Sequence, residues 1–182
     1  MSQTILDNAN DKMNKTIESF EHNLIQIRTG RANPAMLDGI EVEYYGSKTP
    51  LNQVSAITVP EGRQLLIKPY DKTLVEGIER AINEANLGIN PQSDGENIRL
   101  NIPALTEESR KLLVKDVAKY AEDAKVAIRN IRRDANDAIK KDKELTKDDV
   151  QGYQDDVQEL TDKTIKKVDE IAKAKETDLM RV

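Results

Sequence analysis

The sequence predicts an α+β fold in which a long three-helix bundle carries a small inserted β/α/β domain. Three long segments place apolar residues at steps of three and four, which is the period of an amphipathic helix. Residues 31–104, between the first and second of these segments, hold short apolar runs separated by turn residues. Charged residues make up 34% of the 182 residues and aromatic residues 3%, which suits long exposed helices better than a thick core.

The first helical segment begins near the N-terminus and is predicted to end at Arg28, with Gly30 as its C-terminal stop. A single helix of about 28 residues with a narrow apolar seam cannot bury that seam alone. It therefore needs the other two helices as packing partners. Its predicted seam consists of Ile5, Ala9, Met13, Thr16, Phe20, Leu24 and Ile27.

The second and third helical segments have clear N-terminal signals, with Thr106 and Thr146 as N-caps followed by acidic residues. The short stretch 142–145 joins them, which predicts an antiparallel hairpin of helices. Residues 1–30 and 105–182 together then form the bundle. The predicted seam of the second helix is Leu113, Val117, Tyr120, Ala124, Ala127, Ile131, Ala135 and Ala138, and that of the third is Val150, Tyr153, Val157, Leu160, Thr164, Val168 and Ile171.

The inserted domain, residues 31–104, is predicted to contain three strand pairs and one helix. The strands are expected at 40–45 before a turn at Gly46-Ser47, at 54–59 and 64–68 around Glu61-Gly62, and at 89–92 and 98–102. The helix is expected from Asp71 to about Asn86. Two short crossings between compact units predict a hinge, made of Gly30, Arg31, Ala32, Pro103, Ala104 and Leu105.

The composition excludes most catalytic classes. The chain has no cysteine and a single histidine, His22, and it lacks the motifs of phosphate loops, nucleophile elbows and zinc proteases. The paired acids Asp148-Asp149 and Asp155-Asp156 lack the spacing of a calcium loop. We therefore expect no enzyme, metal, cofactor or small-molecule substrate. Without a signal peptide or an apolar run of about 18 residues, a cytoplasmic protein is expected. We also expect a monomer.

A basic stripe on the second helix is the strongest functional signal. Residues 125–143 contain seven basic and three acidic side chains, although the whole chain has a net charge of −5. Such a local excess can contact a polyanion, with arginines suited to phosphate, or it can form an ordinary solvated face with exposed ion pairs. Helical spacing gathers Lys125, Arg129, Arg132, Arg133, Asn136 and Lys140 on one face, and Arg28 and Arg31 at the first crossing add two further candidates for phosphate contact.

Several ordered motifs resemble the ribosome recycling factor family. They are Ile27-Arg-Thr-Gly-Arg-Ala-Asn-Pro34, Val42-Glu-Tyr-Tyr-Gly46 followed by Pro50-Leu51, Arg129-Asn-Ile-Arg-Arg-Asp-Ala-Asn136, Gln154-Asp-Asp-Val-Gln-Glu-Leu-Thr161 and Lys175-Glu-Thr-Asp-Leu-Met180. The similarity covers essentially the full length. Asp178 departs from it, standing where a glutamate is common, and the junction at 141–146 is compact.

The resemblance implies an L-shaped, two-domain molecule with tRNA-like dimensions. It also implies that the protein splits post-termination ribosomes into subunits together with elongation factor G, which hydrolyses the GTP. The bundle would lie along the large subunit with the basic stripe facing ribosomal RNA, and the inserted domain would swing when elongation factor G pushes on it. The alternatives are a helical scaffold or coiled-coil interaction protein, whose basic stripe pairs with an acidic helix, and a nonspecific RNA-binding module.

Overall fold

The computed structural model describes residues 2–181 of the chain. The chain forms two compact units, one made of Met1–Arg28 with Thr106–Val182 and the other of Thr29–Leu105. The second unit begins two residues earlier and ends one residue later than the predicted limits of 31–104. The mixture of long helices and a small sheet confirms the predicted α+β class.

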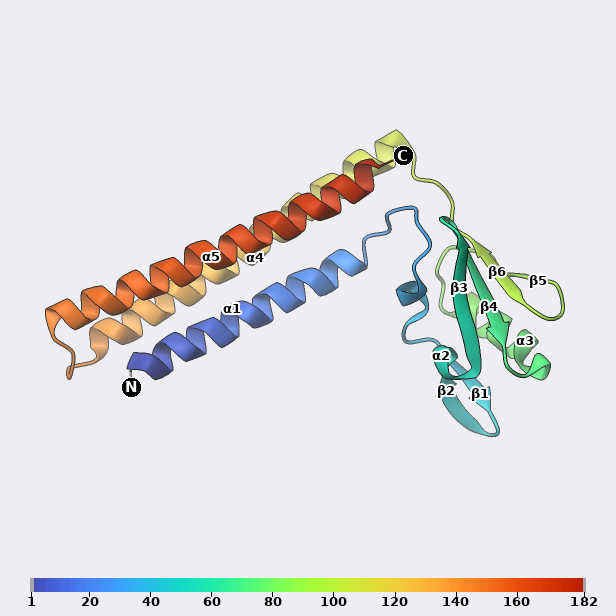
Figure 1. Cartoon of the computed structure of the whole chain (residues 1–182), viewed down its shortest axis with the longest axis horizontal. Coiled ribbons are helices and arrows are strands. Elements are labelled where there is room, and N and C mark those ends of the chain that lie inside the picture. Colours follow the sequence, from blue (N-terminus) through green and yellow to red (C-terminus); the bar gives the residue numbers. More distant parts are fainter. Residues whose placement is uncertain (1, 182) are drawn as a thin grey trace. The chain divides into compact units, whose positions relative to one another are not determined.

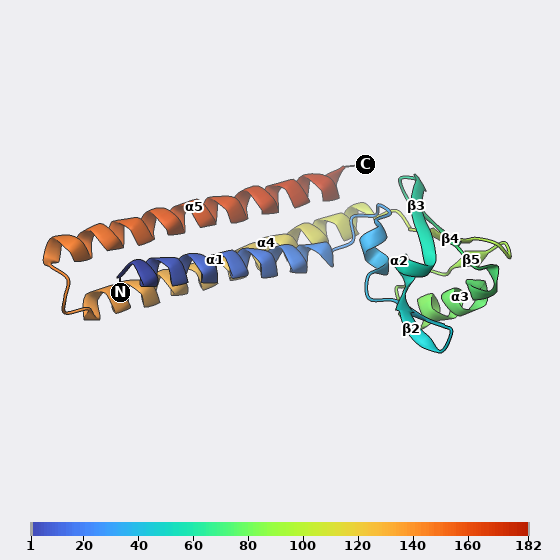
Figure 2. The same cartoon turned by 60° about the horizontal axis from the view of Figure 1, so that its bottom comes forward.

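The first unit is a bundle of three long helices: α1 (Ser2–Ile25), α4 (Glu107–Lys141) and α5 (Lys147–Met180). Each helix packs against the other two. Figures 1 and 2 show α4 running antiparallel to both α1 and α5. None of the helices within residues 2–181 combines the length and the apolar character that crossing a bilayer requires.

Both predicted N-caps are confirmed. The Thr106 hydroxyl accepts a hydrogen bond from the Ser109 amide at 3.1 Å. At the start of α5 the Thr146 hydroxyl accepts from the Asp149 amide at 3.1 Å, and the Asp149 carboxylate accepts from the Thr146 amide at 3.0 Å. This reciprocal capping box satisfies amides that the first turn of a helix otherwise leaves unpaired.

The predicted end of the first helix is wrong. The helix ends at Ile25 instead of Arg28, and a hydrogen bond from the Ile27 amide to the Leu24 carbonyl forms a tighter turn. This turn keeps Ile27 buried while Ile25 is 62% exposed. Gly30 lies beyond the turn with φ +74°, so it shapes the crossing into the second unit and does not cap α1.

The predicted seams need correction because each helix packs against two neighbours, which centres the buried face between two rows of residues. In α1, Ile17 is buried where Thr16 was predicted. In α4, Ala138 is exposed and Leu113, Tyr120, Ala127 and Ile131 are half-buried. The buried residues of α4 are Val117, Ala121, Ala124, Ile128, Ala135 and Ile139, and those of α5 are Val157, Thr161, Thr164, Val168, Ala172 and Leu179.

The second unit contains two antiparallel sheets. One is the hairpin of β1 (Glu41–Tyr44) and β2 (Ser47–Pro50), and the other has the order β3-β4-β6-β5, made of Ser55–Glu61, Gln64–Pro69, Ile98–Asn101 and Gln92–Ser93. The three predicted strand pairs are present, but the first two turns lie one residue away from their predicted positions. The predicted strand 89–92 is wrong in its bounds, because it shares only Gln92 with β5. Tyr45 and Gly46 form the first turn, with φ of 46° and 79°, as a two-residue hairpin turn requires.

The core of the second unit lies between the four-stranded sheet and α3 (Val75–Glu84). Alternate residues of β4 and β6, together with Ile78 and Ile82 of α3, are fully buried there. The predicted helix from Asp71 divides into a 3₁₀ turn, Lys72–Leu74, and α3, with the Asp71 carboxylate accepting from the Thr73 amide at 2.9 Å. The short elements Pro34–Leu37 (η1) and Leu51–Val54 (α2) were not predicted.

Candidate nucleic-acid interface

The basic stripe, defined as Lys125, Arg129, Arg132, Arg133, Asn136 and Lys140, lies on the flank of α4 that borders α5. Two cross-helix contacts fix this position. Lys125 forms an ion pair with Asp169 of α5, and Nη1 of Arg132 donates to Oε1 of Gln158 at 3.2 Å. The stripe therefore lies along the edge of the contact between α4 and α5, where side chains of both helices meet, and not on an isolated face of α4.

The members of the stripe differ in how their charge is balanced. Lys125 has a side chain that is only 20% exposed beside Asp169, and Arg129 pairs with Glu122 at 3.2 Å. Arg133 and Lys140 are exposed, and neither has an ion-pair partner within the described residues. Positive charge available to a polyanion is thus concentrated towards the C-terminal half of α4.

Asn136 occupies the middle of the stripe but is half-buried. Its Oδ1 atom is buried and accepts no hydrogen bond from the residues that the structure describes. Its exposed surface is smaller than the sequence pattern indicates.

The two arginines of the first crossing belong to different units. Arg28 belongs to the bundle unit and follows the last residue of α1 by three positions. The C-terminal end of α1 lies at the end of the bundle where α4 begins (Figure 1). Arg129 lies 22 residues after the first residue of α4, a distance of about 33 Å along a helix. Arg31 is exposed and belongs to the second unit. Within the bundle, the structure therefore does not gather Arg28 with the α4 stripe.

The two crossings between the units lie close to each other within the second unit. A Cβ atom added to Gly30 would stand 3.2 Å from Cγ of Leu105. Both crossing segments are also hydrogen-bonded to the turn that joins β3 and β4. The Ala32 amide donates to the Gly62 carbonyl and the Ile102 amide to the Arg63 carbonyl, each at 2.8 Å.

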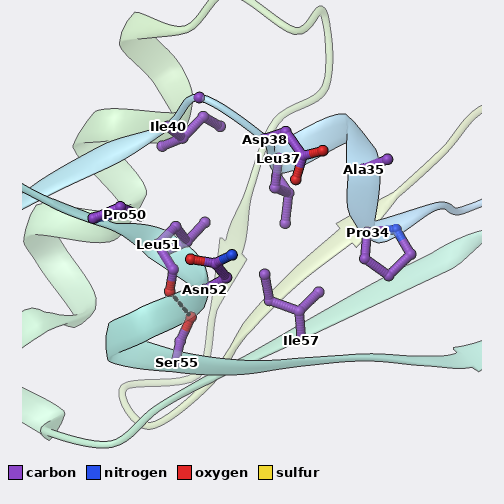
Figure 3. Close-up of a pocket in the computed structure, with 11 residues that line it drawn as sticks. Pro34, Ala35, Leu37, Asp38, Ile40, Pro50, Leu51, Asn52, Ser55 and Ile57 are labelled. Atoms are coloured by element: carbon purple, nitrogen blue, oxygen red, sulfur yellow. Dashed lines mark hydrogen bonds between the residues drawn. The ribbon is translucent and has the colours of Figure 1, made fainter. Parts of the chain in front are cut away.

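The second unit also contains a cavity of about 540 Å³ between the segment around η1 and the stretch Pro50–Ile57. Figure 3 shows apolar side chains, among them Leu37, Leu51 and Ile57, converging on it. The Ser55 hydroxyl donates to the Leu51 carbonyl at 2.7 Å, and Asp38 is the one carboxylate in the lining. This set offers neither a nucleophile with its base nor a pair of acids. Within residues 2–181, no group of three or more potential metal ligands gathers elsewhere.

Sequence reasoning identified the basic residues but missed their partners Glu122, Gln158 and Asp169. The seven-residue step between Glu122 and Arg129 on one helix was a usable signal. The α5 partners required the pairing register of two antiparallel helices, which the sequence pattern does not specify.

Comparison with known proteins places the whole chain in one group. A sequence model of the family described as ribosome recycling factor matches residues 20–180. The ribosome-recycling factors of Bacillus subtilis (strain 168) and Bacillus licheniformis are 53% and 52% identical to this chain over 185 residues, with 100% of both chains covered in each case.

Solved structures agree with the sequence relatives. A solution structure of a ribosome recycling factor is 38% identical, with a TM-score of 0.84, and covers 100% of this chain and 98% of its own. A second structure places the T. thermophilus ribosome recycling factor and the E. coli elongation factor G on the E. coli post-termination complex. It is 42% identical, with a TM-score of 0.65 and full coverage of both chains.

Proposed function

This chain belongs to the ribosome recycling factor family, and we propose on that premise that it splits post-termination ribosomes into subunits together with elongation factor G. Splitting releases mRNA and tRNA for a new round of translation. The GTP is hydrolysed by elongation factor G, because members of this family are not enzymes. Because the proposed function is carried out on ribosomes, we expect this chain to act in the cytoplasm.

The observation that carries this proposal is the full-length match, in sequence and in fold, to proteins of one named function. A relative 42% identical over its whole length is described with elongation factor G on the post-termination complex. The match to that relative covers the full length of both chains, so it includes both compact units of the present chain.

The basic stripe is the proposed contact with ribosomal RNA of the large subunit. Phosphate neutralisation by lysine and arginine supplies most of the sequence-independent affinity for nucleic acid. Among the stripe residues, Arg132, Arg133 and Lys140 are not opposed by a carboxylate within the described residues, so they are expected to contribute most. Lys125 and Arg129 must first exchange an internal partner for a phosphate. Asn136 and the crossing residues Arg28 and Arg31 are secondary contacts in this proposal.

The paired crossings are the proposed hinge, made of Gly30, Arg31, Ala32, Pro103, Ala104 and Leu105. The hydrogen bonds of Ala32 and Ile102 to the β3–β4 turn fix where the second unit begins as a folded body. Helices α1 and α4 fix the corresponding ends of the bundle at Ile25 and Glu107. Any rotation of the inserted unit must occur in the few residues between these points. Elongation factor G would drive that rotation.

The docking proposal is tested by Arg132→Ala and by binding to purified ribosomes across a range of salt concentrations. Losing one phosphate contact should weaken binding and reduce the slope of log affinity on log salt by about one. Lys163→Ala is the matched control, because Lys163 is an exposed basic residue of α5 outside the stripe. Equal affinity of Arg132→Ala and wild type at moderate salt would refute the docking surface. A helical scaffold would instead bind a protein partner and fail to co-sediment with ribosomes.

A further inference from the structure

Two consecutive side-chain hydrogen bonds connect Arg132 to Gln158 and Gln158 to Asp162, and both of these partners lie on α5. The Nη1 atom of Arg132 donates to Oε1 of Gln158 at 3.2 Å, and Nε2 of Gln158 donates to Oδ1 of Asp162 at 2.8 Å. The second bond fixes which end of the Gln158 amide faces α4, because the amide nitrogen is engaged by the carboxylate. The carbonyl oxygen is therefore presented to the guanidinium.

The partner of Arg132 differs in kind from the partners of its neighbours. Lys125 is opposed by the carboxylate of Asp169, and Arg129 by that of Glu122. A carboxylate orients a cation and also cancels its charge. A neutral amide orients the cation and leaves the charge in place. Of the three stripe residues with side-chain partners among residues 2–181, Arg132 alone meets a neutral acceptor.

We propose that Gln158 is a positioning residue that holds the Arg132 guanidinium for a phosphate of ribosomal RNA without neutralising it. This inference rests on the proposed function, in which Arg132 contacts RNA. A guanidinium has five N–H donors, so one bond to Gln158 leaves the others for a ligand. Fixing the side chain before binding also removes part of the rotamer entropy that a free arginine loses on docking.

We expect a negative charge introduced at residue 158 to weaken ribosome binding more than removal of the Gln158 side chain does. Gln158→Glu should convert the contact into an ion pair and withdraw Arg132 from phosphate. Since one phosphate contact contributes a salt slope of about 0.9, affinity should fall roughly tenfold at 0.1 M salt and the slope should shrink by about one. Gln158→Ala leaves the charge of Arg132 intact, so it should reduce affinity by only about two- to threefold with the slope unchanged.

Gln151 offers a matched control on the same helix. Its Nε2 atom donates to Oδ1 of Asp155 at 2.9 Å, which repeats the bond between Gln158 and Asp162, but no bond joins it to α4 among the described residues. Gln151→Glu therefore adds the same charge to α5 without touching an arginine. Its affinity for ribosomes should stay within about twofold of wild type, since the added charge removes no phosphate contact.

The experiment measures ribosome co-sedimentation of the full chain at several salt concentrations for each variant, alone and combined with Arg132→Ala. In the Arg132→Ala background, neither substitution of Gln158 should have a further effect. If Gln158→Glu binds as well as Gln151→Glu while Arg132→Ala is weakened, the positioning role is wrong and the proposed function stands. A loss from Gln158→Glu that persists without Arg132 also overturns the positioning role. An unaffected Arg132→Ala overturns the positioning role together with the proposed RNA-docking surface.

Discussion

Two isoleucines of α4, Ile128 and Ile131, test where the core of the bundle lies. The sequence pattern places Ile131 in the seam, whereas the structure buries Ile128 completely and leaves Ile131 half-buried. Ile131 packs at the margin of a cluster formed by Ala9, Ala135, Ile139 and Val157. The two residues lie three positions apart in the interior of one helix, so they share side-chain size and helix propensity.

The expected losses follow from burial. Replacing isoleucine with alanine removes three carbon atoms, worth about 0.8 kcal/mol each when fully buried, or about 2.4 kcal/mol of transfer free energy. A cavity term raises the loss for Ile128→Ala to about 3–4 kcal/mol. For Ile131→Ala part of the side chain is already in water and the gap opens to solvent, so about 1–2 kcal/mol is expected.

Urea unfolding followed by circular dichroism at 222 nm measures both losses, because most helical residues belong to the bundle. The free energy of unfolding is expected to fall by about 2 kcal/mol per molar urea. Ile128→Ala should therefore lower the urea concentration at the unfolding midpoint by about 1.5–2 M, and Ile131→Ala by less than about 1 M. Ribosome binding of the folded variants should be unchanged. If Ile131→Ala destabilises the chain as much as Ile128→Ala, the assigned core is wrong.

Three further substitutions probe local features. Gly30→Val forces a β-branched residue into φ +74° and against Leu105, at a cost of about 1–3 kcal/mol. In paired assays this substitution should reduce subunit splitting more than ribosome affinity. Equal losses would mean that Gly30 only supports folding. Hydrogen bonds from the Thr146 side chain and amide hold the pKa of Asp149 below its ordinary value, so their stabilisation is complete above about pH 4 and disappears as pH falls through the lowered pKa. The thermal midpoint of Asp149→Asn should therefore lie below that of wild type at pH 7 and converge with it in acid; a pH-independent difference would contradict this. Tyr45→Asn, at φ 46°, should raise the thermal midpoint slightly, since asparagine tolerates the left-handed region better, and a lowered midpoint would show that the tyrosine ring stabilises the hairpin.

Features set by local chemistry were predictable from the sequence. Thr106 and Thr146 cap their helices because a hydroxyl followed by acidic residues satisfies the first amides wherever the helix is packed. The hairpin at Tyr45-Gly46 was predicted to within one residue for a similar reason, since a two-residue turn needs positive φ. The strands of the inserted sheet were predictable because short runs with apolar residues are bounded by turn residues.

Features set by packing were not predictable. The end of α1 depends on the burial of Ile27, and the shift of the α4 seam to Ile128 depends on having two neighbouring helices. The basic residues of the stripe were identified from helical spacing, but the sequence did not show that Asp169 neutralises Lys125 while Gln158 leaves Arg132 charged. That distinction arises from the register of α4 against α5.

Sedimentation of purified post-termination ribosomes on sucrose gradients tests the central claim most directly. The full chain, elongation factor G and GTP together should convert the ribosome peak into separate subunits, and omission of any one of them should leave it intact. Arg132→Ala should leave most ribosomes unsplit at a protein concentration at which Lys163→Ala splits them fully. Ribosomes that stay intact with all three components present, or that split equally well with Arg132→Ala, would contradict the account.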